Sequence, residues 1–263
     1  MNESLPLLRF PSLSAFPGLV HAVSTRGGGV SPEPYASLNL STSTGDSREN
    51  VDANHWRLAE ALDVPREHFT TSWQIHGTRV LHATAEMAGR MIDQADGIIT
   101  DTPGLPLTQR YADCTPLLIY DPRRHATGLG HAGWRGTVAG MAGALVEAMR
   151  TALGSDPADL IAVIGPAIGP CCYEVGPEVV TAVHGAFPAV PELLSQPANG
   201  AGARPSGPHL DLWAANRWQL EQAGVGQIEM AAICTRCQSE TFFSHRGNGP
   251  VTGRFGAVVM LKA

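Results

Sequence analysis

Residues 111–136, "YADCTPLLIYDPRRHATGLGHAGWRG", contain two short apolar runs that each meet a polar turn. The runs "PLLIY" and "ATGLGHA" predict two β-strands, because short apolar segments bounded by Pro, Asp and Gly are typical of buried strands. Cys114 stands just before the first run and His131 near the end of the second. The following residues read as a turn and a helix start, so we expect His131 and Arg135 at the carboxyl end of a strand. Ligand sites of α/β proteins lie at such strand ends, and anions bind at helix N-termini.

On both sides of this segment, predicted strands are interspersed with predicted helices. Apolar periodicity predicts helices over residues 47–64, 137–153, 177–187 and 211–224. Short apolar runs predict further strands over residues 68–73, 78–84, 96–100, 160–165, 227–234 and 255–262. This alternation indicates a mixed α/β layer protein and argues against a helical bundle.

The composition limits the classes of partner. Hydrophobic residues make up 43% of the 263 residues and charged residues 16%, which is typical of a compact globular chain and not of a disordered one. The formal net charge of -6 provides no broad basic field for a nucleic-acid backbone or an anionic membrane. The N-terminal segment lacks a signal-peptide pattern, and no run of about eighteen apolar residues follows. We therefore expect a cytoplasmic protein that binds neither nucleic acid nor membrane.

One low-complexity segment interrupts the second half of the chain. It is rich in Pro, Ala and Gly and predicts a flexible loop over residues 188–209. A helix and two strands still follow it, so we expect a single domain over residues 1–263. The sequence identifies no protein partner, and we expect a monomer or a small homo-oligomer.

Three short motifs each place one candidate metal ligand beside a turn: "WQIHG" with His76, "YADCTP" with Cys114 and "GHAGWRG" with His131. Zinc binds imidazole nitrogen and thiolate sulfur, and three protein ligands leave a fourth position open, as in catalytic sites. Copper can also bind such a set. The spacing of the three residues matches no short regular zinc motif, so the pattern gives a hypothesis and not an assignment.

Other interpretations of these residues stay open at this point. His131 could be a buried histidine with a satisfied ring, and Cys114 a small buried hydrophobic residue. Alternatively, Cys114 could be the nucleophile of a cysteine hydrolase, with His76 or His131 as the base and Asp113 beside them. The residues alone do not separate a ligand thiolate from a nucleophilic one.

Two further motifs carry weaker signals. The segment "TRGGGV", with Arg26, resembles a phosphate-binding loop only loosely and predicts a tight turn. The segment "CTRC", Cys234 to Cys237, has the spacing of half a zinc knuckle, but its candidate partner is the adjacent pair Cys171 and Cys172, which is sterically awkward for one tetrahedral ion. Five cysteines in this pattern do not suggest a disulfide framework. We therefore expect no second metal site.

Taken together, the motifs identify a resemblance along nearly the whole chain. The sequence resembles the laccase-domain (YfiH-type) family, first described as multicopper polyphenol oxidases and later as purine nucleoside phosphorylases with adenosine deaminase activity. The matching segments are "STRGGGVSPEPYASLNLS", "WQIHG", "ADGIITDTPGLPLTQRYADCTPLLIYDP", "GHAGWRGTVAGM", "IGPAIGPCCYEVG" and "FFSHRGNGPVTGR".

The resemblance implies a fold, a metal and a reaction. It implies a four-layer α/β sandwich with mixed sheets, of the YfiH-like type, and zinc bound by His76, Cys114 and His131. The implied reaction joins phosphate to the ribose of adenosine, inosine or methylthioadenosine and releases the base. If adenosine is also deaminated, Asp113 is the nearest candidate acid or base.

Residue chemistry and motif position suggest the contacts to substrate. Arg26, Arg48 and Arg135 are candidates for binding the phosphate anion. Asn39 and Gln74 are candidates for polar contacts to the nucleoside.

Copper-dependent phenol oxidation is the alternative enzyme class. A multicopper oxidase needs, besides a site of two histidines and one cysteine, a cluster built from many histidines, commonly paired as H-x-H. This chain has ten histidines and no H-x-H pair. The sequence therefore favours the nucleoside reaction.

Overall fold

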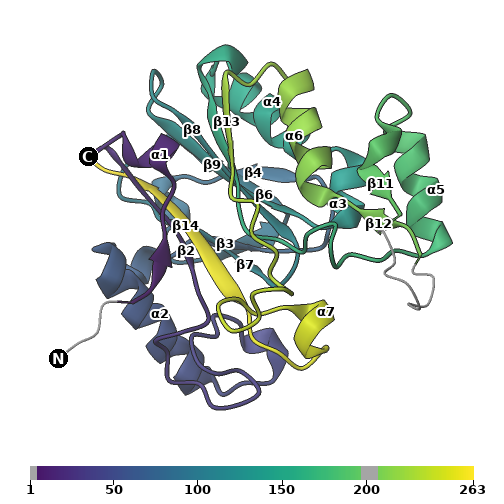
Figure 1. The fold of residues 1–263 in the computed structure, drawn as a ribbon. Helices are drawn as coiled ribbons and strands as arrows, with labels where there is room; N and C mark the ends of the chain where they lie inside the picture. The colour runs from purple at the N-terminus through teal and green to yellow at the C-terminus, as the bar shows by residue number, and fades with distance from the viewer. Residues whose placement is uncertain (1–4, 197–206) are drawn as a thin grey trace.

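The two apolar runs form strands, as predicted: β8 (Thr115–Asp121) and β9 (Ala126–Ala132). They form an antiparallel pair at the centre of a six-stranded sheet. The computed structural model describes residues 5–196 and 207–263 (Figure 1). Pairing is antiparallel in the middle of this sheet and parallel at both edges, so the sheet is mixed. From edge to edge its strands are β13 (Gln227–Met230), β10 (Ile161–Ile164), β8, β9, β6 (Gly97–Thr100) and β4 (Val80–His82).

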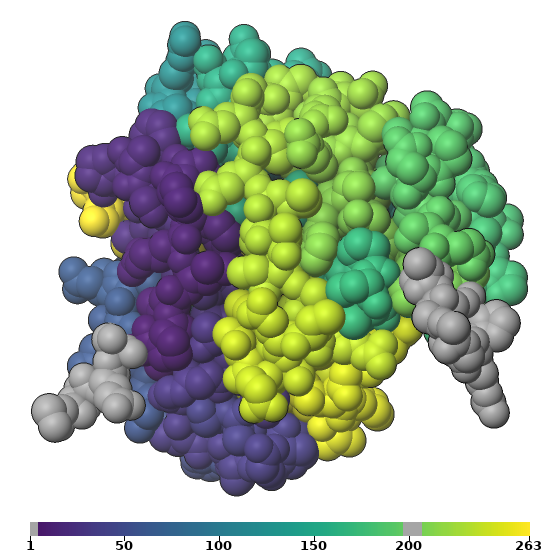
Figure 2. Space-filling view, viewed as in Figure 1, coloured from purple at the N-terminus to yellow at the C-terminus, as the bar shows by residue number. Residues whose placement is uncertain are grey.

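A second, antiparallel sheet joins the two ends of the described chain. Its strands, in order, are β1 (Leu7–Leu8), β2 (Leu19–Ser24), β14 (Phe255–Leu261) and β7 (Leu107–Tyr111). The early and late segments also meet outside the strands, since the Arg26 N–H donates to the Thr241 carbonyl at 2.8 Å. In the space-filling view the purple N-terminal and yellow C-terminal segments accordingly lie side by side (Figure 2).

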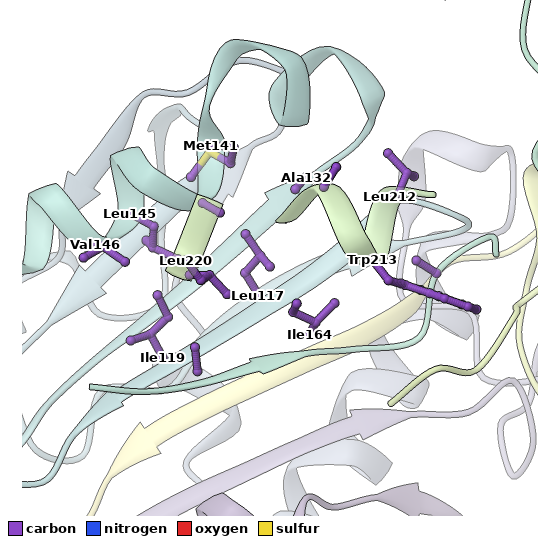
Figure 3. Close-up of a cluster of buried hydrophobic side chains, with 14 of the residues drawn as sticks. Leu117, Ile119, Ala132, Met141, Leu145, Val146, Ile164, Leu212, Trp213 and Leu220 are labelled. Atoms are coloured by element: carbon purple, nitrogen blue, oxygen red, sulfur yellow. The ribbon is translucent and has the colours of Figure 1, made fainter. Parts of the chain in front are cut away.

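Side chains alternate along β8 between two cores. Leu118 and Tyr120 pack between the sheets, with Leu107 of the four-stranded sheet in the same cluster. Leu117 and Ile119 point to the other face, where they join the core formed with the helices (Figure 3). Because both of its faces are covered, β8 is buried along its whole length, which explains why its residues 116–120 are all apolar.

Helices cover the outer face of each sheet. Helices α4 (Met141–Leu153) and α6 (Leu212–Gln222) pack on the six-stranded sheet, and α2 (Arg48–Leu62) packs on the four-stranded one. The order of packing is therefore helix, sheet, sheet, helix (Figure 1). Gly130 in β9 leaves room for α4, since a Cβ there would lie 3.0 Å from the Leu145 side chain.

The remaining elements are short or lie beside these layers. Helix α5 (Pro177–Ala186) lies next to α3 (Trp134–Ala139). The other helices and strands are α1 (Pro11–Ser14), α7 (His245–Asn248), the parallel pair β3 (Thr71–Trp73) and β5 (Met91–Gln94), and the antiparallel pair β11 (Leu194–Ser195) and β12 (His209–Leu210). Short 3-10 helices occupy Thr42–Thr44, Arg66–His68, Ala85–Met87, Pro157–Asp159 and Pro191–Leu193.

The structure confirms the mixed α/β class but corrects three local expectations. The single helix expected over 137–153 is two helices, because Gly140, with φ 95°, ends α3 in a left-handed conformation before α4 begins. The strand expected over 227–234 ends at Met230. Strands β2, β5 and β7 were not expected at all, although β2 and β7 flank β14 in its sheet.

Two further expectations concern segments and not elements. Residues 197–206, the centre of the predicted flexible loop, lie outside the described residues, and the flanking segments contribute β11 and β12. Among the helices that the structure describes, none combines the length and the apolar character that crossing a bilayer requires.

Candidate active site

Three side chains from separate segments converge where β8 begins and β9 ends. Cys114 immediately precedes β8, and His131 lies next to the last residue of β9, because antiparallel pairing places Thr115 opposite Ala132. His76 follows β3. The donor atoms of His76, Cys114 and His131 all lie within 4.8 Å of one another, and the two imidazole ring centroids are 4.9 Å apart.

The backbone beside these donors is unusual. His76 has φ 62° and the neighbour of Cys114, Asp113, has φ 86°, values that non-glycine residues seldom adopt. Such conformations persist where the surrounding structure enforces them, and they concentrate at functional sites. Two of the five non-glycine residues with positive φ in the described chain thus lie at the convergence of donors.

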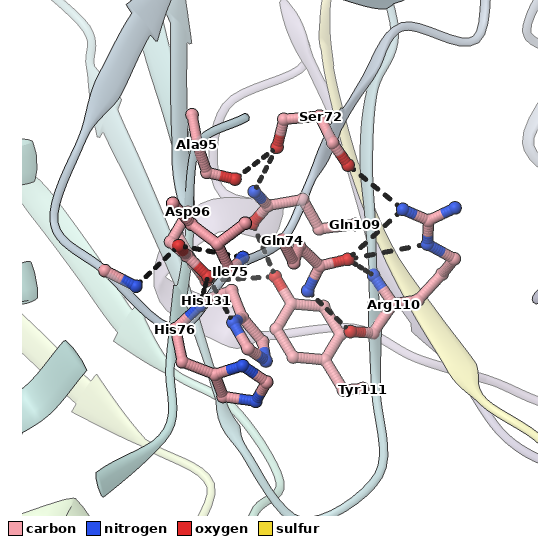
Figure 4. Close-up of polar contacts among 12 residues, drawn as sticks. Ser72, Gln74, Ile75, His76, Ala95, Asp96, Gln109, Arg110, Tyr111 and His131 are labelled. Carbon is pink, nitrogen blue, oxygen red and sulfur yellow. Dashed lines mark hydrogen bonds and ion pairs between the residues drawn. The ribbon is translucent and has the colours of Figure 1, made fainter. Parts of the chain in front are cut away.

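A buried carboxylate, Asp96, holds two of the three donors in position (Figure 4). Its Oδ1 lies 2.8 Å from His131 Nδ1 and accepts the His76 backbone N–H at 2.9 Å. Its Oδ2 accepts the backbone N–H groups of Gly77 at 2.7 Å and Ile75 at 3.2 Å. The contact with Asp96 favours a proton on His131 Nδ1, so that Nε2 is the nitrogen that would face a metal. Sequence analysis did not identify Asp96, although the quoted motif "ADGIIT" contains it.

Charge within the site favours a thiolate. Burial favours the neutral thiol of Cys114, but His131 and His76 outweigh this effect and lower its pKa to about 6. Burial alone would lower the pKa of His131, whereas Cys114 and Asp96 raise it to about 9. A thiolate of this kind can bind a soft metal ion or attack an electrophile.

The donor set fits a metal ion such as zinc. Two imidazoles and one thiolate are ligands that zinc accepts, and three of them leave one position open. Space is available because residue 133 is glycine: a Cβ there would lie 2.8 Å from Cys114 Sγ and 3.0 Å from His76 Cδ2. Gly133 has an ordinary φ of -74°, which any residue can adopt. A larger residue is therefore disfavoured here by the lack of room for a Cβ and not by the backbone conformation.

The three donors open into a cavity of about 560 Å³ that is rich in positive charge. This volume is within the usual range for small-molecule sites. Asp113 is the one acidic residue among the described residues that line it. Four arginines line the cavity: Arg110, Arg135, Arg246 and Arg254. Aromatic and apolar walls are formed by Trp73, Met91, Trp134, Ile168, Tyr173 and Leu212.

Two of the predicted contact residues, Arg135 and Gln74, line this cavity, and so does Asp113, the candidate acid or base. Arg135 is largely exposed, with its guanidinium over the Trp134 ring at 4.2 Å. Gln74 is bound to the backbone of Arg110 through both ends of its amide. The Asp113 carboxylate accepts the Thr235 hydroxyl at 2.7 Å and the Arg246 backbone N–H at 2.6 Å, so both oxygens already have partners.

The other three predicted contact residues do not line the cavity. Arg26 donates to the carbonyls of Ala36 and Ser239 and stabilises a turn. Asn39 is fully buried and bonds to Ser41, so it supports the segment whose residues 41–43 line the cavity. Arg48 is exposed at the start of α2.

Sequence reasoning missed several residues of the cavity wall. Arg110 lies in β7, an unexpected strand, and donates to the Ser72 carbonyl at 3.0 Å. Arg246 and Arg254 both belong to the motif "FFSHRGNGPVTGR", together with His245. Two arginines and a histidine in one Gly-rich motif were the available signal.

The steric argument against a second metal-binding group does not hold in the structure. The structure brings Cys171, Cys172, Cys234 and Cys237 together, with all four sulfur atoms within 4.8 Å of one another. The adjacent pair lies in a turn, and both of its sulfur atoms approach Cys237 Sγ, at 3.5 Å from Cys171 and 3.4 Å from Cys172.

The layered fold and the site of two histidines and one cysteine define the class of protein. The chain belongs to the family described as "Multi-copper polyphenol oxidoreductase laccase", whose model matches residues 20–262, and this confirms the laccase-domain resemblance.

Relatives with assigned names are similar to this chain over most of its length. The purine nucleoside phosphorylase of Deinococcus radiodurans is 40% identical over 258 residues, which cover 98% of this chain and 93% of the relative. The purine nucleoside phosphorylase YlmD of Geobacillus stearothermophilus is 39% identical over 253 residues, covering 93% and 90%.

Two solved structures share the fold. The crystal structure of YlmD from Geobacillus stearothermophilus matches with a TM-score of 0.87 at 35% identity and covers 100% of this chain and 98% of that one. The Bacillus licheniformis hypothetical protein YfiH matches with a TM-score of 0.89 at 32% identity, covering 99% and 98%.

Proposed function

We propose that this protein is a zinc-dependent purine nucleoside phosphorylase. It would convert adenosine, inosine or methylthioadenosine and phosphate into the free base and a phosphorylated sugar, ribose 1-phosphate for adenosine and inosine. The observation that carries the proposal is that one cavity combines three metal-capable donors, four arginines and an aromatic wall. The names of the relatives at 39% and 40% identity support the same reaction.

The arginines suit an anionic co-substrate. Phosphate at neutral pH carries between one and two negative charges, and a cavity with a single acidic residue and four guanidinium groups attracts it in a chain whose net charge is negative. Arg110 and Arg254 are half-buried and anchored through backbone carbonyls, which holds their charge in place. Fixed charges of this kind stabilise a transition state without reorganising.

The purine ring, unlike phosphate, needs an apolar surface, and the aromatic wall of the cavity provides one. Trp73 is 55% exposed at the cavity and Tyr173 lies half-buried in it, and both present faces on which a base can stack. In the reaction, a phosphate oxygen bonds to C1′ of the ribose while the bond from C1′ to the base breaks. The electron pair leaves with the base, which takes up a proton. His245, which also lines the cavity, is a candidate donor of that proton.

His76, Cys114 and His131 would hold the zinc ion, which supplies a Lewis acid with one open coordination position. The role of the protein here is orientation. Asp96 keeps His131 in one tautomer and ties the loop of His76 to the sheet. Because the support for the donors is buried, the site is preorganised before substrate binds.

We further propose adenosine deamination in the same cavity, with water attacking C6 of the base and ammonia leaving. The same donors and the same place for the base support it. Asp113 would serve as a positioning residue, since its carboxylate is held by Thr235 and Arg246.

Two alternatives make different predictions. A cysteine hydrolase would use Cys114 as the nucleophile, and its low pKa beside His131 favours that possibility. A copper oxidase would need a histidine-rich cluster, and within residues 5–196 and 207–263 the groups of three or more metal-capable residues are the His76 set and the four cysteines. The donor inventory of the described chain therefore favours the phosphorylase.

The test combines metal content with product analysis by chromatography, using adenosine with and without phosphate. We expect zinc in the purified protein and phosphate-dependent release of adenine and ribose 1-phosphate. His76→Ala should lose both, whereas His82→Ala, an exposed histidine outside the cavity, should keep both. Inosine formed without phosphate would report deamination. Full activity in metal-free protein would overturn the proposal and favour Cys114 as a nucleophile. Copper with phenol oxidation and no base release would also overturn it.

A further inference from the structure

The four cysteines outside the active site lie on two turns at the same end of the six-stranded sheet. Strands β10 and β13 pair in parallel, so their carboxyl ends lie side by side. The pairing continues beyond the strands as a bridge between Ala167 and Cys234. One turn then carries Cys171 and Cys172 and the other Cys234 and Cys237, which is why residues about sixty positions apart come together.

The distances between the sulfur atoms match a tetrahedral metal site. Cys237 Sγ lies 3.5 Å from Cys171 Sγ and 3.4 Å from Cys172 Sγ, and all four sulfurs lie within 4.8 Å of one another. Zinc–sulfur bonds of about 2.3 Å arranged as a tetrahedron place the sulfurs about 3.8 Å apart. All of these cysteines are free thiols in the structure.

The surroundings suit a group of thiolates. The Gly169 backbone N–H donates to Cys234 Sγ at 3.3 Å, a type of support that is typical of metal-bound sulfur. Arg236, between the two cysteines of the C-x-x-C segment, donates to the Cys172 carbonyl at 3.3 Å, which holds a positive charge beside the cluster. Four thiolates around a divalent ion carry a formal charge of -2, so this arginine is complementary to the loaded site.

We propose that Cys171, Cys172, Cys234 and Cys237 bind a structural zinc ion, separate from the one in the active site. Four protein ligands close the coordination sphere, and soft thiolates in a tetrahedral set favour zinc. The inference stands on these four residues and holds whether or not the chain is a phosphorylase.

The cluster lies beside the active-site cavity, so an ion bound there would stabilise structure next to that cavity. Ile168 and Tyr173, on either side of the first turn, line the active-site cavity. Thr235, next to Cys234, donates to Asp113, which adjoins Cys114. An ion at the cluster would therefore fasten the first turn, whose neighbours Ile168 and Tyr173 line the cavity, to the second turn, whose Thr235 holds Asp113.

The decisive measurement is the zinc content of full-length protein purified without added metal. We expect about two zinc ions per chain in the wild type. Cys237→Ser should lose one and keep the active-site ion, whereas the matched variant Cys114→Ser should lose the other and keep the cluster ion. A wild type with about one zinc ion that Cys237→Ser retains would overturn the proposal.

A second measurement on the unchanged protein covers the case in which Cys237→Ser does not fold. Cys171 and Cys237 are exposed, so a thiol reagent should modify them quickly unless a metal holds them. We expect slow modification in the purified protein and fast modification after a strong chelator removes zinc, with all five thiols counted after denaturation. Fast modification before chelation, or a count short by two thiols that signals a disulfide, would overturn the proposal. Iron in place of zinc would overturn the choice of ion.

Discussion

The two cysteine-containing donor sets of this protein differ in composition and in support. The His76, Cys114 and His131 set has three donors, opens into a charged cavity and rests on the buried Asp96 carboxylate. The four-cysteine set is closed, lies largely at the surface and rests on backbone turns. We infer from this contrast that an open donor position needs rigid support from the core, whereas four ligands can organise themselves around an ion.

Filling the space beside the open site should separate the two sets most sharply. In Gly133→Ala, the new Cβ would contact Cys114 Sγ and His76 Cδ2, so we expect loss of the active-site zinc and a fall in kcat/KM on the order of 10³-fold. The cluster zinc should remain. Elemental analysis and phosphorolysis kinetics measure both quantities, and unchanged zinc and activity would contradict the tight fit at Gly133.

Removing the charge of Asp96 should weaken the open site without removing a donor. Asp96→Asn keeps the shape but loses the carboxylate that binds His131, and we expect zinc affinity to fall about 10- to 100-fold. The control Asp93→Asn alters an exposed residue paired with Arg79 and should leave affinity unchanged. Competition with a chelator of known affinity gives the comparison. Equal affinities in the two variants would show that Asp96 does not support the donors.

Acid should destabilise the fold through histidines that belong to neither donor set. Burial, together with Arg9 for His21 and Arg66 for His55, lowers each pKa from 6.5 to about 4. Between these values the unfolded chain binds more protons than the folded one, so stability present above pH 6.5 is lost as the pH falls to about 4. The loss should be on the order of 3 kcal/mol for each histidine.

Denaturant unfolding across the range from about pH 7 to about pH 4 measures this loss. His21→Gln and His55→Gln should flatten the dependence, each in proportion to its share. A dependence that is equally steep in both variants would assign acid sensitivity to other groups.

The smallest expected effect is a gain in stability far from both sets. Gly143 lies within α4, and a Cβ added there would meet open space, so Gly143→Ala should stabilise the protein by about 1 kcal/mol. Zinc content and activity should not change. The variant is thus the control for Gly133→Ala, and a loss of zinc in both would point to a general effect of adding a methyl group.

The sequence pattern predicted the strands that consist mainly of apolar residues. It missed strands that contain buried polar residues. Apolar residues and glycine make up most of β8 and β9, and both strands were predicted correctly. In β7, "LTQRY" is polar in sequence but buried almost throughout, because Gln109 is enclosed and bonded to Ser72 and Tyr111. Strand β2, "LVHAVS", includes His21, which is buried with Nε2 accepting the Phe10 N–H. Local composition cannot predict that a polar residue is buried when its hydrogen-bond partner is distant in sequence.

Local periodicity and residue chemistry were enough to predict the mixed α/β class, the β8 and β9 pair and the three candidate donors beside turns. They could not predict that Asp96 supports the donors, that four arginines share their cavity, or that two cysteine pairs meet. Each of these depends on contacts between segments far apart in the chain, which the pairing of strands and the packing of sheets create. The sequence shows which residues can act as donors. Their geometry is fixed by the strands whose ends bring them together.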